Sequence, residues 1–134
     1  MKITSTLAIA CLLLSSCATY HLTTQSLLEQ CATSPKQTKV NLLIAPPFVF
    51  FPGIVDGNSL TQLYCLDKNE NEVMLPVTTH MGMRITQKDG KHTTFYFDTL
   101  LLKDSTVTGS KSHFIVMKIN PIKLANISKI EVQK

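Results

Sequence analysis

Histidine and aspartate are the residue types in this sequence that could perform acid–base chemistry or bind a metal. A histidine can exchange a proton near neutral pH or ligate zinc, and two carboxylates can act as general acid and base. The candidates are His80, His92, His113, Asp98 and Asp104. No pair of the histidines has the i, i+4 or H-x-H spacing of metal sites, and Asp98 falls on the outer face of the strand expected there. We therefore expect solvated or hydrogen-bonded side chains, with no metal site and no catalytic residues.

A cysteine near the N-terminus gives a stronger signal. Lys2 precedes an apolar run that is densest over residues 7–14, which is the length of the apolar region of an export signal and too short to span a bilayer. The run ends in Leu14-Ser15-Ser16-Cys17, an aliphatic residue, two small residues and a cysteine. Small residues let an extended chain enter a peptidase, and a thiol can form a thioether to a lipid.

This motif resembles the lipobox of bacterial lipoproteins. The resemblance implies a signal peptide over residues 1–16, cleavage before Cys17 and a covalent lipid on that cysteine, with no other cofactor. Because Ala18 rather than an aspartate follows, it further implies an outer-membrane location facing the periplasm. Two alternatives remain: an ordinary signal peptide cut after Ala18, or an uncleaved core segment.

The two later cysteines, Cys31 and Cys65, allow two interpretations. An exported protein can form a disulfide between them, but sequence alone does not place them within bridging distance. A buried free thiol at Cys65, inside an apolar run, is the alternative. Neither belongs to a CxxC pair, so the sequence does not indicate a redox or zinc motif.

Length and charge are those of one small domain. The chain has 134 residues and a formal net charge of +4, with the excess of basic residues in the second half. No run of like charge occurs, so solvated lysines are favoured over a surface for anionic lipid or polysaccharide. The sequence has no aromatic-plus-basic motif and no Gly-rich phosphate loop, and we expect no nucleic-acid partner.

The first part of the exported chain, residues 17–37, is expected to be a tether with one short helix. Ser26 and Glu29 match a capping box, and Ser34-Pro35 ends the helix after about two turns. The domain is then expected to occupy residues 38–134. Leu27, Leu28 and Cys31 would pack against it.

Residues 40–55 are the most apolar part of the exported chain. Prolines exclude a helix and a central strand, so we expect short strands at Val40–Ile44 and around Phe48–Phe50. Phe48, Phe50 and Phe51 would then fill the core. The alternative is an exposed apolar lip that contacts lipid or a partner.

The best structural signal is a hairpin over residues 81–99. Only a three-residue loop, Lys88 to Gly90, places the apolar residue Met83 opposite Phe95. That loop is a type I turn followed by a G1 bulge, with Gly90 at the position that needs positive φ. Pattern and turn chemistry therefore agree on one register.

Further strands are expected along the rest of the chain, at residues 60–66, 72–77, 100–102, 105–108, 111–119 and 127–133. Gly109-Ser110 suits a type II′ turn, after which Ile115, Met117 and Ile119 would face inward. About six to eight antiparallel strands with one short N-terminal helix predict a mostly β fold, a small barrel or sandwich.

The pattern from Met81 to Lys134 is similar to that of small bacterial lipoproteins with SH3-like barrels. The chain also resembles conserved envelope lipoproteins without an assigned activity, which implies that no catalytic residues carry over. We expect a membrane-anchored structural or binding module that is not an enzyme and recruits an envelope protein or polysaccharide. The alternatives are an accessory subunit of an envelope transport or secretion complex, and a small periplasmic hydrolase using Asp98, Asp104, His80 and His113.

Overall fold

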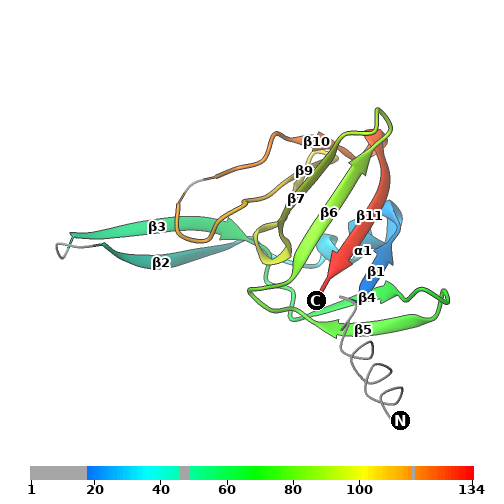
Figure 1. The fold of residues 1–134 in the computed structure, drawn as a ribbon, viewed down its shortest axis with the longest axis horizontal. Helices are drawn as coiled ribbons and strands as arrows, with labels where there is room; N and C mark the ends of the chain where they lie inside the picture. The colour runs from blue at the N-terminus through cyan, green and yellow to red at the C-terminus, as the bar shows by residue number, and fades with distance from the viewer. Residues whose placement is uncertain (1–17, 46–48, 116) are drawn as a thin grey trace, which may run out of the picture.

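The computed structural model describes residues 18–45, 49–115 and 117–134, with the backbone alone for 39–45 and 49–54. These residues form an antiparallel β structure with one α-helix (Figure 1). The largest sheet has six strands in the order β5-β4-β1-β11-β6-β7. Its strands are β1 (Thr19–Leu22), β4 (Gln62–Leu66), β5 (Glu72–Pro76), β6 (Gly82–Gln87), β7 (His92–Tyr96) and β11 (Ile127–Gln133).

A three-stranded sheet, in the order β10-β9-β8, is the second sheet of the fold. Its strands are β8 (Leu101–Lys103), β9 (Thr106–Thr108) and β10 (Ile122–Lys123). Two 3-10 turns, η2 (Phe97–Thr99) and η3 (Leu124–Asn126), connect the sheets, and helix α1 spans Thr24–Ala32. The sheets do not close into a barrel, and the arrangement is consistent with a sandwich.

The predicted fold class is thus confirmed as mostly β, antiparallel and with one short N-terminal helix. The described residues contain eleven strands, more than the expected six to eight. The additional ones are short, such as the two-residue β10, and take strand geometry from backbone pairing with neighbours distant in sequence. The core draws fully buried side chains from α1, from η2, from the six-stranded sheet and from the three-stranded sheet, including Leu27, Leu63, Met83, Phe97 and Val107.

The hairpin of β6 and β7 has the predicted register. Met83 lies opposite Phe95, and the amide of Gly90 donates to the carbonyl oxygen of Gln87 at 2.9 Å. Gly90 has φ of 86°, the positive value that a G1 bulge requires.

Replacing Gly90 with valine is therefore expected to destabilise the protein by about 1–3 kcal/mol, because a β-branched residue resists this conformation. Thermal denaturation followed by circular dichroism measures the effect, with Asp89→Ala in the same turn as the control. A melting temperature equal to that of the wild type would contradict the bulged turn.

The N-terminal tether is the first prediction that the structure overturns. Thr19–Leu22 forms β1, which pairs with β11 along its whole length and with β4 at one position. The segment is polar, but Leu22 is buried, and the backbone pairing does not depend on side-chain polarity. The helix also begins earlier than predicted, because the hydroxyl of Thr23, not Ser26, caps it by accepting from the Ser26 amide at 3.1 Å.

The predicted turn at Gly109-Ser110 is also wrong. Ser110 pairs with Lys118 in an isolated bridge, and the Ile119 amide donates to the Gly109 carbonyl oxygen at 3.0 Å. The chain therefore reverses between these two arms rather than at Gly109. Of the residues expected to face inward, Ile119 is buried, whereas Ile115 and Met117 are exposed because they lie in the connecting loop.

A ribbon of two strands, β2 (Gln37–Ala45) and β3 (Val49–Gly57), forms a sheet of its own and extends away from the rest of the domain (Figure 1). The strands are longer than predicted, and β3 tolerates Pro52 because a two-stranded ribbon has only edge strands. The backbones of Phe50 and Phe51 pair with Ile44 and Leu43. Phe48 and the side chains of Phe50 and Phe51 lie outside the described part of the chain. The two interpretations of these residues, as core or as an exposed apolar lip, therefore both concern residues outside it.

Cys31 and Cys65 are both buried and both free, so the structure has the free thiols rather than the disulfide. Burial raises the pKa of each thiol from 9.0 to about 11.

Alkylation of these two thiols at pH 8 is therefore expected to be at least about a hundredfold slower in the native protein than after denaturation, because both the thiolate fraction and access are reduced. Mass spectrometry after timed iodoacetamide treatment measures this, with each Cys→Ser variant to assign the sites. The control is protein that is denatured without a reductant. If Cys31 and Cys65 take up no label under that condition, they form a disulfide and the assignment as free thiols is wrong.

Candidate functional site

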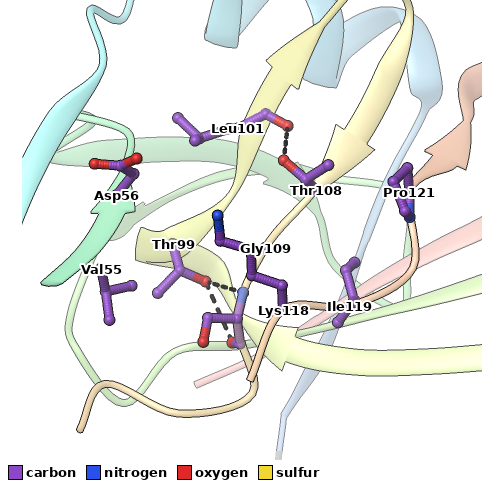
Figure 2. Close-up of a pocket in the computed structure, with 10 residues that line it drawn as sticks. Val55, Asp56, Thr99, Leu101, Thr108, Gly109, Lys118, Ile119 and Pro121 are labelled. Atoms are coloured by element: carbon purple, nitrogen blue, oxygen red, sulfur yellow. Dashed lines mark hydrogen bonds between the residues drawn. The ribbon is translucent and has the colours of Figure 1, made fainter. Parts of the chain in front are cut away.

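The candidate site is a pocket of about 320 Å³ beside the base of the ribbon (Figure 2). Four parts of the chain enclose it: the end of β3, the turn η2, the strands β8 and β9 with the two residues after β9, and the segment from Lys118 to Pro121. The lining residues are Val55, Asp56, Thr99, Leu101, Thr108, Gly109, Ser110, Lys118, Ile119 and Pro121. A volume near 300 Å³ is at the lower end of the range for small-molecule sites.

Charged side chains lie at the edge of this pocket. Figure 2 shows the Lys118 side chain reaching across it, with its amino nitrogen toward the side where Asp56 and Leu101 lie. The Asp56 carboxylate already has partners, the Lys36 ammonium at 2.8 Å and the Thr38 hydroxyl at 3.0 Å. These contacts hold the pKa of Asp56 below its ordinary value, so the carboxylate is ionised at neutral pH.

Two buried hydroxyl residues form the floor of the pocket. Thr99 donates its hydroxyl to the Tyr96 carbonyl oxygen at 2.7 Å and accepts from the Ser110 amide at 2.8 Å. The Ser110 hydroxyl in turn donates to the Ser112 carbonyl oxygen at 2.6 Å. Because these bonds join η2 to the segment after β9, they fix the position of one pocket wall relative to the other.

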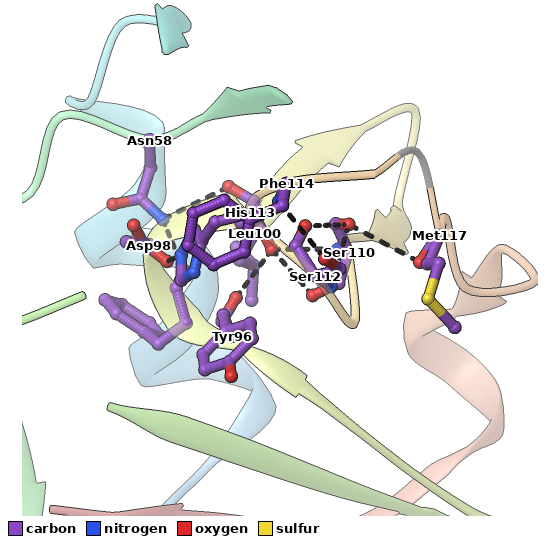
Figure 3. Close-up of polar contacts among 11 residues, drawn as sticks. Asn58, Tyr96, Asp98, Leu100, Ser110, Ser112, His113, Phe114 and Met117 are labelled. Carbon is purple, nitrogen blue, oxygen red and sulfur yellow. Dashed lines mark hydrogen bonds and ion pairs between the residues drawn. The ribbon is translucent and has the colours of Figure 1, made fainter. Parts of the chain in front are cut away.

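Asp98 and His113, next in sequence to Thr99 and Ser112, form a buried ion pair or hydrogen-bonded pair (Figure 3). Nε2 of His113 is 2.8 Å from Oδ1 of Asp98, and the two side chains are only 14% and 3% exposed. The imidazole ring also packs on Tyr96, with 4.2 Å between ring centroids. This pair therefore fastens the 111–117 loop to the body of the domain.

The outward position predicted for Asp98 is wrong, whereas His113 is hydrogen-bonded, one of the two states expected for the histidines. The prediction assumed that strand alternation continues to Thr99, but β7 ends at Tyr96 and η2 follows. In the 3-10 turn the period is no longer two, and Asp98 turns inward. His113 is largely buried where its imidazole meets the Asp98 carboxylate.

Asn58 is a residue of this network that the sequence analysis missed. It is 5% exposed, and its side-chain amide donates to the carbonyl oxygens of Phe97 and Leu100 at 2.8 and 3.1 Å. Its backbone amide donates to the Asp98 carbonyl oxygen. The polar Asp56-Gly57-Asn58 sequence directly after an apolar run was the one local signal for it.

The remaining candidates are not brought to this site. His80, His92 and Asp104 are exposed and belong to other turns or strand ends. Within residues 18–45, 49–115 and 117–134, no group of three or more His, Cys, Asp or Glu side chains could hold a metal ion. Cys17 lies outside the described residues, and in the described part no helix is long and apolar enough to cross a membrane.

Comparison with models of known protein families, with curated proteins and with solved structures gives no match.

Proposed function

We propose that this chain is a lipid-anchored protein of the bacterial cell envelope whose β domain is a binding module rather than an enzyme. The lipid is attached to Cys17, and the domain faces the periplasm from the outer membrane. Support for the anchor comes from the Leu14-Ser15-Ser16-Cys17 motif at the end of a short apolar run.

The observation that carries the binding role is the pocket beside the ribbon. Its floor is held by hydrogen bonds of buried Thr99 and Ser110, and the loop that follows is fastened by Asp98 and His113. A site whose walls are fixed before a ligand arrives loses less conformational entropy on binding. The contacts of Asp98 and His113 therefore fit a role in holding the pocket wall.

The position of β1 supports close attachment to the bilayer. Thr19 already pairs with Gln133, so Ala18 alone separates Cys17 from the six-stranded sheet. The start of β1 and the C-terminus lie at the same end of that sheet, and the turn between β6 and β7 lies at the other (Figure 1). A lipid on Cys17 would hold the first end toward the membrane and point the Lys88–Gly90 turn away from it.

Mass spectrometry of the native protein purified from its own membranes tests the anchor. The proposal requires Cys17 to be the first residue and to carry acyl chains. An unmodified amino terminus downstream of Cys17 would overturn it and leave an ordinary secreted domain.

An accessory subunit of an envelope transport or secretion complex is the second candidate, and the projecting ribbon favours it. Strands β2 and β3 pair with each other and with no other described strand. A photo-crosslinking residue at Asn41, in the ribbon, would capture one partner at fixed stoichiometry if the ribbon docks into a complex. The same residue at Asp89, in the distant hairpin turn, is the matched control.

A further inference from the structure

We propose that the pocket binds a small anionic amphiphile, with its apolar part between Val55, Leu101 and Ile119 and its anionic group at Lys118. The inference rests on the proposed binding function and names the ligand class of the same pocket. It depends on three features of the pocket: the apolar walls, the charge at its edge and its size.

The apolar walls come from three separate segments. Val55 is 6% exposed and Ile119 5%, so their side chains are already packed and present formed surfaces. Leu101 and Pro121 extend this lining on the side of the second sheet. An apolar group placed between them would be removed from water, which is favourable in proportion to the apolar area buried.

The charge at the edge of the pocket favours an anion. Lys118 and Asp56 line the pocket, and Lys36 does not line it but forms an ion pair with Asp56, so the three residues together carry one net positive charge. The direct contacts of the Asp56 carboxylate are with Lys36 and Thr38, and Lys118 acts on it through space. The Lys118 ammonium is therefore the cation of the pocket lining that we expect to receive the charged group of a ligand. A hydrogen bond between two charged groups is among the stronger ones in proteins.

The size of the pocket restricts the apolar part. A volume of about 320 Å³ suits one short alkyl chain or one ring, not two acyl chains of a phospholipid. The ligand class is therefore a short carboxylate or phosphate with a single apolar group.

Methyl NMR on the full chain, in the mature form in which its own cells produce it, tests the proposal. The isoleucine methyl groups are labelled, and hexanoate, hexanol and hexyltrimethylammonium are titrated in turn. Ile119 reports on the pocket, and Ile130, which is buried in the six-stranded sheet, is the internal reference. We expect hexanoate to shift Ile119 in a saturable way and to bind at least about tenfold more tightly than hexanol, because only hexanoate can pair with Lys118.

Charge reversal at Lys118 sharpens the test. In Lys118→Glu the preference should change from hexanoate to hexyltrimethylammonium, and in Lys118→Gln hexanoate and hexanol should bind alike. Lys123→Glu makes the same charge change on an exposed residue of β10 that does not line the pocket, and should leave hexanoate binding unchanged. An unshifted Ile130 signal in each variant shows that the fold is kept.

Three outcomes would overturn the proposal: equal affinity for hexanoate and hexanol in the wild type, hexanoate binding unaffected by Lys118→Glu, or equal shifts at Ile119 and Ile130. These results do not depend on the lipid at Cys17. If mass spectrometry finds the lipid and hexanoate does not bind, the ligand class alone is wrong. If hexanoate binds and the lipid is missing, the anchor alone is wrong.

Discussion

Replacing Cys17 with serine is expected to abolish incorporation of a palmitate analogue and to leave the leader uncleaved. A serine hydroxyl does not form the thioether that carries the diacylglyceryl group, and the acyl chains supply the membrane affinity of such proteins. The expected loss of labelling is complete, because the thioether needs the sulfur of this one residue. Metabolic labelling and membrane fractionation of cells that express each variant measure it.

Cys11→Ser is the matched control, because Cys11 lies inside the apolar run and not at its end. Labelling should persist in that variant. Unchanged labelling in Cys17→Ser, or its loss in Cys11→Ser alone, would place the lipid elsewhere and refute the assignment of the lipobox.

The second large effect is expected at Asp98. Asp98→Ala should lower the free energy of unfolding by about 3 kcal/mol or more, because it leaves the largely buried His113 without the carboxylate 2.8 Å away. Urea denaturation followed by circular dichroism measures the change. Glu29→Ala removes an exposed carboxylate from α1 and should change the free energy by less than about 1 kcal/mol.

A double-mutant cycle with His113→Ala separates the pair from the other contacts of each residue. If the two side chains stabilise the fold through each other, the double variant should lose less than the sum of the single variants. Strictly additive losses would show that Asp98 and His113 act independently, and the role assigned to them in fastening the 111–117 loop would be wrong.

The predictions that succeeded rest on local chemistry. The register of β6 and β7 follows from alternating apolar residues on both sides of a loop whose Gly90 accepts positive φ. Residues near in sequence decide such a hairpin, so the sequence carries all the necessary information. The same is true of β4 and β5, which match the strands expected at residues 60–66 and 72–77. Between them the Asp67 carboxylate accepts from the amides of Asn69 and Asn71.

The predictions that failed concern segments whose conformation is set by distant partners. β1 is polar, and it becomes a strand because Tyr20 pairs with Val132 at the other end of the chain. After Tyr96 the chain enters η2, where the Leu100 amide donates to the Phe97 carbonyl oxygen, and the Tyr96 amide donates to the Ser110 carbonyl oxygen. No alternation of side chains near Asp98 reveals these bonds, so its inward position was not predictable from the sequence.

The sequence by itself determined the β class of the domain and its best-defined hairpin, and it carries the motif at Leu14 to Cys17 on which the proposed lipid anchor rests. Each of these depends on residues that are neighbours along the chain. Tertiary structure alone decided the pocket and the Asp98–His113 pair. Val55, Leu101 and Ile119 meet there only after two sheets have packed together, and burial against those sheets makes a carboxylate and an imidazole partners.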